Sequence, residues 1–170
     1  MGGTRGEARL LAALRDCRLV NIDTNALVYY LDDRLPYADL MEAVFRRVRR
    51  GEMKIVISSV AQMELLVKPI KDRDITAIDA VIGFTEQTAN MTVVDVSRPV
   101  VMQAARLRAE GLPVADSLIL ATGLVMECNA IITNDGGWRR IVDTLKERSP
   151  IMPGDVPLSM PKVLYLNDYV

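Results

Sequence analysis

The sequence predicts an α/β fold, a three-layer sandwich built around a five-stranded parallel sheet. Short runs rich in β-branched residues alternate with longer segments of helical periodicity along the chain. These runs are apolar enough to be covered on both faces, which is typical of parallel strands. Half of the 170 residues are hydrophobic, so residues 1–170 are expected to form one domain with a sizeable core. The five expected strands span residues 19–22, 54–58, 91–96, 130–133 and 162–166.

The first helices are predicted from the spacing of apolar residues. Residues 1–17 carry leucines interrupted by charges, and we expect an amphipathic N-terminal helical extension there. Leu40, Val44 and Val48 lie four residues apart, which predicts a helix over residues 36–50.

Capping residues and prolines mark the helices that follow. Ser59 and Gln62 form a capping-box pattern, which predicts a helix from there to Val67. Pro69 is expected to end that helix, because proline cannot donate a backbone hydrogen bond. Three further helices are expected around Ile75, Ile78 and Ile82, over residues 99–110 and over residues 115–128.

Two segments differ from the rest of the pattern. Residues 115–128 are apolar nearly all round, which predicts a helix buried inside the fold. Residues 149–161 are rich in proline and are expected to form a semi-rigid connection before the last strand.

Composition excludes several classes of function. The chain contains no histidine, which excludes Ser-His-Asp and Cys-His catalysis and histidine-based zinc sites. Cys17 and Cys128 cannot form a disulfide framework, so we expect a reduced, cytoplasmic protein. With 21 basic against 22 acidic residues, overall charge alone would not hold the chain to nucleic acid. No uncharged apolar run is long enough to span a membrane, so no membrane partner is expected.

Four carboxylates follow strands or begin helices at the same predicted edge of the sheet. Asp23 ends the first strand, Asp135 follows the fourth, Glu64 lies about one turn into the helix after the second, and Asp116 begins the buried helix. Ligands of open parallel sheets bind beyond the carboxyl ends of the strands. Taken singly, these acids have simpler explanations, as helix caps for Asp23 and Asp116, a turn residue for Asp135 and a solvated helix residue for Glu64. Together they favour a site for Mg²⁺ or Mn²⁺, because hard oxygen donors without His or Cys select those ions.

The segments that carry these acids are VNIDTN at 20–25, Ser58 and Ser59 with Glu64, GLPVADSLILAT at 111–122 and IITND at 131–135. In this order, over roughly residues 18–145, the chain resembles the PIN-domain metal-dependent ribonucleases and is most similar to the VapC-type toxins of toxin–antitoxin pairs. The resemblance implies the strand order 3-2-1-4-5. It also implies that Asp23, Glu64, Asp116 and Asp135 form the acidic catalytic site.

The resemblance gives each acid a role in cleaving a phosphodiester bond of RNA. Asp23, Asp116 and Asp135 would bind Mg²⁺ or Mn²⁺ directly or through water. Glu64 would orient or deprotonate the attacking water. The expected supporting residues are Thr24 and Asn25, which would hold Asp23 by hydrogen bonds, and Thr133 and Asn134, which would bind a carboxylate or a phosphate.

The expected function is therefore a metal-dependent endoribonuclease, with RNA as substrate, an antitoxin protein as a possible partner and a homodimer as the assembly. The alternative is a PIN-type RNA-binding or scaffold module with little turnover. A response-regulator receiver is disfavoured, because the lysine that it requires at the fifth strand is not evident. A haloacid-dehalogenase phosphatase needs a second aspartate two residues after Asp23, where this chain has Asn25.

RNA binding requires positive charge near the acidic site. Arg139 and Arg140 follow Asp135 closely and are the expected RNA-binding residues. A second group, residues 46–50, has the alternative explanation that arginine is favourable at a helix C-terminus. The aromatic residues Tyr29, Tyr30 and Trp138 are suited either to stacking on bases or to packing in the core.

Overall fold

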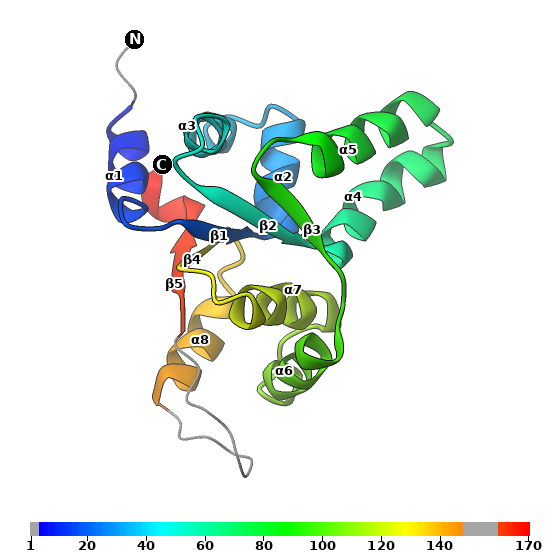
Figure 1. The fold of residues 1–170 in the computed structure, drawn as a ribbon. Coiled ribbons are helices and arrows are strands. Elements are labelled where there is room, and N and C mark those ends of the chain that lie inside the picture. The colour runs from blue at the N-terminus through cyan, green and yellow to red at the C-terminus, as the bar shows by residue number, and fades with distance from the viewer. Residues whose placement is uncertain (1–3, 148–159) are drawn as a thin grey trace.

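The fold is organised around one parallel sheet. The computed structural model describes residues 4–147 and 160–170. Its five strands are all parallel and lie in the order β3-β2-β1-β4-β5, which confirms the predicted fold class and strand order (Figure 1). The strands are β1 (Leu19–Ile22), β2 (Lys54–Ser58), β3 (Met91–Val94), β4 (Ala130–Thr133) and β5 (Lys162–Tyr165).

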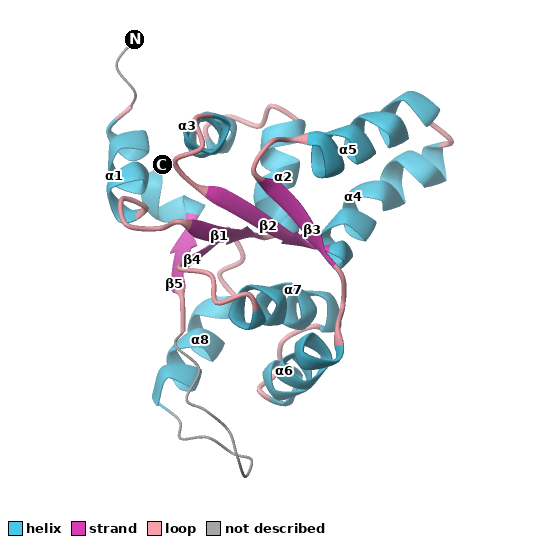
Figure 2. Cartoon of the chain, in the orientation of Figure 1, coloured by secondary structure: helices cyan, strands magenta, loops and turns pink. Residues whose placement is uncertain are grey.

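Helices cover both faces of the sheet and complete the three layers. Figure 2 shows α2, α3 and α5 over one face and α6, α7 and α8 over the other. None of the helices in the described part of the chain is long and apolar enough to cross a membrane. The helices are α1 (Arg5–Ala13), α2 (Thr24–Leu31), α3 (Tyr37–Arg49), α4 (Ser59–Asp72), α5 (Ile75–Gln87), α6 (Arg98–Ala109), α7 (Val114–Val125) and α8 (Trp138–Glu147), followed by the short 3-10 helix η1 (Leu166–Tyr169).

The helix after β2 differs from its prediction at both ends. Its N-cap is Ser58, whose hydroxyl accepts a hydrogen bond from the backbone N–H of Val60 at 3.2 Å, so the predicted capping box is wrong. Helix α4 then continues through Pro69 to Asp72. Proline removes one backbone donor, but α4 packs along α5 as a helical hairpin, and packing outweighs that local cost. The helix ends where Arg73 adopts a left-handed conformation with φ of 56°.

Two strand ends also differ from expectation. Strand β3 ends at Val94, two residues before its predicted end, and Leu166 belongs to η1 rather than to β5. Most of the predicted proline-rich connection at 149–161, like the first three residues of the predicted N-terminal extension, lies outside the described residues.

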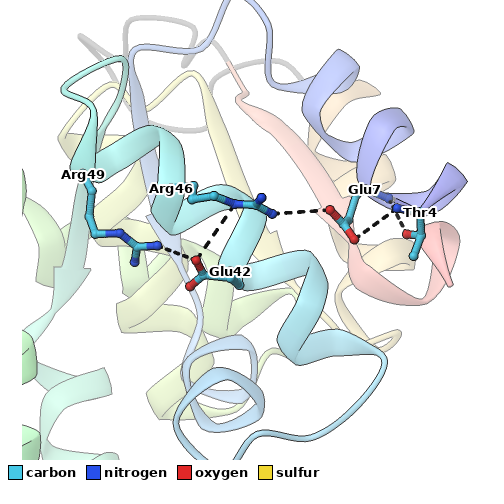
Figure 3. Close-up of polar contacts among 5 residues, drawn as sticks. All are labelled: Thr4, Glu7, Glu42, Arg46 and Arg49. Carbon is cyan, nitrogen blue, oxygen red and sulfur yellow. Dashed lines mark hydrogen bonds and ion pairs between the residues drawn. The ribbon is translucent and has the colours of Figure 1, made fainter. Parts of the chain in front are cut away.

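The arginines at the end of α3 are paired with glutamates. Figure 3 shows Glu42 between Arg46 and Arg49, and Glu7 of α1 contacting Arg46 at 3.5 Å. Glu7 also completes a capping box with Thr4 at the start of α1. Since α3 leads into the first residue of β2, this group lies at the amino ends of the strands, and the helix C-terminus explanation fits it better than RNA binding.

Strand β1 packs closely against α7, the helix that carries Asp116. Asn21 is fully buried in β1, and its side-chain amide donates a 2.8 Å hydrogen bond to the carbonyl of Ile119. A Cβ at Gly123 would lie 2.6 Å from that Asn21 nitrogen and 2.9 Å from Cδ1 of Ile131. Only glycine therefore allows this close approach of helix to strand.

A Gly123→Ala variant is expected to lose about 1–3 kcal/mol of unfolding free energy, because the added methyl group forces the buried Asn21 and Ile131 to shift. Urea unfolding followed by circular dichroism measures this. The matched control is Gly83→Ala in α5, where the nearest atom to a new Cβ is a flexible Gln87 oxygen 3.9 Å away. That variant should gain up to about 1 kcal/mol from helix propensity. Equal stabilities for the two variants would contradict the close packing.

Candidate functional site

The candidate site lies at the carboxyl ends of β1, β2 and β4. Asp23 follows β1 directly and is the N-cap of α2, where its Oδ1 accepts a 2.7 Å hydrogen bond from the backbone N–H of Thr24. Asp135 follows β4, Glu64 lies in the second turn of α4, and Asp116 lies in the first turn of α7. The parallel topology therefore places all four predicted acids around the carboxyl ends of the strands, and the central strand β1 ends among them.

Two predicted supporting residues hold the carboxylate of Asp23. Its Oδ2 accepts a 2.6 Å hydrogen bond from the hydroxyl of Thr133 and a 2.7 Å hydrogen bond from the side-chain amide of Asn25. Thr133 itself is fully buried. Thr24 contacts two of the acids: its backbone N–H donates to Asp23, and its hydroxyl donates to Oε2 of Glu64 at 2.5 Å. Thr24 thus links the carboxyl end of β1 to the second turn of α4.

Burial dominates the electrostatics of Asp23, which is 4% exposed. Loss of hydration raises the pKa of this carboxyl from 3.8 to about 7, and repulsion from Asp116 and Glu64 adds to the rise. The hydrogen bonds from Thr133 and from the Thr24 backbone oppose it only in part. The site therefore holds an acid that ionises at a cost near neutral pH.

Asp116 is subject to the same effects to a smaller degree. Partial burial raises its pKa, and repulsion from Asp135 and Glu64 raises it further. The indole of Trp138 favours the ionised carboxyl, although the indole nitrogen completes no hydrogen bond with the described residues. The four acids therefore form one electrostatic group. Asp116 and Glu64 raise the pKa of Asp23, and Asp135 and Glu64 raise the pKa of Asp116.

Asp135 shapes the turn between β4 and α8. Its Oδ1 accepts a 2.7 Å hydrogen bond from the backbone N–H of Gly137, and its own N–H donates to the hydroxyl of Thr133 at 3.0 Å. A Cβ at Gly137 would stand 3.0 Å from that same Asp135 oxygen. Gly137 therefore serves the turn, which keeps the carboxylate of Asp135 next to the buried Thr133.

The donor chemistry fits a hydrated divalent cation better than a fully enclosed one. In residues 4–147 and 160–170, no three carboxylate or thiol groups are close enough to hold one ion directly. Yet the acids repel one another, and the group is rich in hard oxygen donors. Mg²⁺ usually keeps several waters and binds through one or two carboxylates, which suits this arrangement.

The residues predicted to bind RNA or bases have different surroundings. Arg139 is ion-paired with Asp168 at 2.6 Å, and its guanidinium lies 3.8 Å from the centre of the Tyr165 ring. Arg140 is exposed beside it. Trp138 is fully buried, which supports the core explanation for that residue. Of the aromatic residues, Tyr29 stacks on Tyr37, and Tyr30 packs against Phe45 and Phe84.

Asn134 makes contacts that the sequence did not predict. Its backbone N–H donates to Asn25 at 2.9 Å, and its side chain contacts Tyr29 and Asn167. Asn167 lies 33 residues away in η1, so only the pairing of β4 with β5 brings the two asparagines together. In the sequence, Asn167 is a single polar residue that belongs to no recognisable motif, so sequence reasoning had no signal by which to find it.

Comparison with known proteins agrees with the fold. No curated protein sequence matches the chain. Among solved structures, VapBC2 from Rickettsia felis bound to a promoter DNA fragment is similar with a TM-score of 0.59 and 15% identity, over 86% of this chain and 98% of that one. FitAcB from Neisseria gonorrhoeae is similar with a TM-score of 0.58 and 15% identity, over 87% and 98%. DNA-bound VapBC from Salmonella typhimurium gives 0.54 and 15%, over 88% and 98%.

The family model of the PIN domain matches residues 20–143, a span that starts at the second residue of β1 and contains β2 to β4 and all four acids. This match covers well over half of the chain and agrees with the strand order and with the resemblance of the sequence motifs. The chain is therefore a member of the PIN domain family.

Proposed function

We propose that this protein is an endoribonuclease that hydrolyses RNA phosphodiester bonds with Mg²⁺ or Mn²⁺. The observation that carries the proposal is the group of mutually repelling acids around Asp23, whose pKa is raised to about 7. A fold keeps such a group at the open edge of a parallel sheet at a cost in stability, and a bound cation offsets that cost.

Asp23, Asp116 and Asp135 would hold the ion in part through bound water. Among the described residues, no three acids lie close enough together to ligate one ion directly. When bound, the ion would lower the pKa of a water and stabilise charge on the phosphate. Thr133 and Asn25 orient the carboxylate of Asp23 through both hydrogen bonds to its Oδ2. Thr24 fixes Glu64 by its hydroxyl, so that the carboxylate can accept a proton from the attacking water.

The substrate would reach the site past the start of α8. Arg140 is exposed there and would attract the phosphate backbone of RNA. Arg139 would contribute its half-exposed guanidinium while it remains paired with Asp168. The two arginines are proposed to position the strand rather than to read its sequence.

We also propose that this nuclease is the toxin of a toxin–antitoxin pair in the cytoplasm. The proposal is supported by the structures it resembles, one of which is described as a toxin–antitoxin complex from Klebsiella pneumoniae, with a TM-score of 0.52 and 20% identity. Helix α4 carries an exposed apolar strip with Met63, Val67 and Ile70, each more than half exposed. Such a strip suits a protein partner, an antitoxin or the second copy of a homodimer.

A Glu64→Gln variant is expected to cleave RNA about 10²–10⁴-fold more slowly than the wild type in Mn²⁺, because an amide cannot accept the proton. The remaining amide oxygen still accepts the hydrogen bond of Thr24, so the fold is kept. The measurement is the rate of cleavage of a fluorescently labelled single-stranded RNA, with EDTA as the control that stops the reaction.

The alternative, an RNA-binding or scaffold module, makes a different prediction for the same samples. It requires wild type and Glu64→Gln to bind the RNA equally and neither to cut it. Wild-type cleavage that persists in EDTA would instead contradict the metal-dependent mechanism.

A further inference from the structure

The short helix η1 lies against the loop that carries Asp135. Strand β5 runs parallel to β4 with Tyr165 beside Thr133, so η1 begins where the loop after β4 begins. Leu166 anchors η1 in the core, where it is fully buried. The residues after it, Asn167 and Asp168, therefore face the edge of the sheet that holds the acids.

Asn167 of η1 and Asn134 of the loop after β4 each donate a hydrogen bond to the other. The backbone N–H of Asn167 donates to Oδ1 of Asn134 at 2.8 Å, and the side-chain amide of Asn134 donates to Oδ1 of Asn167 at 3.4 Å. The hydroxyl of Tyr37, at the start of α3, donates to the same Asn167 oxygen at 2.5 Å. Asn167 thus ties η1 to the loop after β4 and to α3 through its backbone N–H and its side-chain oxygen.

The pair continues to the carboxylate of Asp23. The backbone N–H of Asn134 donates to Oδ1 of Asn25 at 2.9 Å. The amide of Asn25 in turn donates to Oδ2 of Asp23 at 2.7 Å. Three asparagines therefore form one chain of hydrogen bonds from η1 to the most buried acid of the site.

A second contact holds the other end of the same loop. Arg139, in the first turn of α8, pairs with Asp168 of η1 and lies over the ring of Tyr165 in β5. The segment between Asn134 and Arg139, which contains Asp135, is thus tied to the C-terminal residues on both sides.

From these contacts we propose that η1 is a positioning element for the acidic site and that Asn167 is its positioning residue. This inference rests on the proposed function and deepens it, since it assigns to a segment outside the matched family region the task of holding Asn134, Asn25 and Asp23 in register. Residues that orient the ligands of a metal typically change its affinity about 10–100-fold when they are replaced.

The N-terminal extension supports η1 from the other side. Figure 1 shows α1 and the C-terminal end of the chain side by side. A Cβ at Gly6 would lie 1.8 Å from the backbone carbonyl oxygen of Tyr169. The guanidinium of Arg9 lies 5.5 Å from the centre of the Tyr169 ring. Helix α1 therefore fixes η1 in place.

The test compares two asparagines that each accept two hydrogen bonds on one side-chain oxygen and are both exposed. Asn167→Leu removes the acceptor near the site. Asn129→Leu is the matched control, because Oδ1 of Asn129 accepts hydrogen bonds from the backbone of Arg18 and Leu19. These residues lie at the amino ends of the strands, away from the acids. Asn167→Asp is the rescue variant, since a carboxylate keeps both acceptor contacts and adds no repulsion toward a cation.

Two readouts are used on the full-length protein. Isothermal titration calorimetry measures Mn²⁺ affinity, and amide hydrogen exchange in metal-free protein reports the protection of residues 134–137. Asn167→Leu is expected to bind Mn²⁺ about 10–100-fold more weakly and to lose protection at Asn134, whose N–H donates to Asn25. Asn167→Asp should bind at least as tightly as wild type, and Asn129→Leu should match wild type in both readouts.

Unchanged Mn²⁺ affinity and unchanged protection in Asn167→Leu would overturn the proposal, as would equal losses in Asn129→Leu. Failure of the proposed function is distinguishable. If wild type neither binds Mn²⁺ nor cleaves RNA, the nuclease proposal fails, and the exchange of residues 134–137 alone then decides whether Asn167 positions this loop.

Discussion

An Asp116→Asn variant is expected to lose more than about 100-fold of its Mn²⁺-dependent RNA cleavage and yet to fold at least as stably as the wild type without metal. The loss follows because an amide is a poorer ligand for a hard cation than a carboxylate. The stability follows because Asp116 repels its neighbours: its pKa is raised, by burial first and by Asp135 and Glu64 next. Cleavage rates and urea unfolding in EDTA measure the two effects.

The control is Asp79→Asn, the same chemical change on an exposed part of α5. It should leave cleavage and stability as they are in the wild type. Wild-type cleavage by Asp116→Asn would show that this residue is not part of the site. A large fall in metal-free stability would show instead that its carboxylate holds the fold together.

The second large effect is on the pH dependence of stability. An acid whose folded-state pKa lies near 7 and whose unfolded pKa lies near 3.8 binds its proton more tightly in the folded chain. Between these pH values the folded state therefore holds the extra proton, and the free energy of unfolding falls as pH rises. For Asp23 the full fall is on the order of 4 kcal/mol, reached above about pH 7.

Metal is expected to remove this fall. On the proposed function, Mn²⁺ would bind the ionised acids, so the stability of the loaded protein should rise with pH relative to the metal-free protein. Urea unfolding between pH 5 and 8, with EDTA or with saturating Mn²⁺, gives both curves. Two parallel curves would contradict the view that the buried charge of Asp23 is balanced by a cation.

The places of three of the acids in the fold were predictable from the sequence. Asp23 and Asp135 follow strands in which every side chain is apolar or buried, and Asp116 opens an apolar helix, so local patterns fix their places at the ends of elements. Parallel pairing then puts the ends of β1 and β4 side by side. The result depends on topology more than on any single motif.

Other features depend on contacts that local patterns do not contain. Pro69 is a helix breaker by propensity, but α4 extends past it because its hairpin partner α5 packs along its length. Thr24 does bond Asp23 through its backbone N–H, but the contact of its hydroxyl with Glu64, on a different helix, follows from no local pattern. The arginines of α3 had two explanations in the sequence, and only their glutamate partners, one of them on α1, favour the helix C-terminus over a binding surface.

The position of Asn167 has a consequence for how the protein is made. The ribosome synthesises a chain in order, so all four acids emerge before the strand and the turn that carry Asn167. On our proposal, the nascent chain can build most of the sheet while the loop of Asp135 still lacks its tether. The capacity to cut RNA would then arise only after translation has passed residue 167, which spares the message and the ribosome during synthesis.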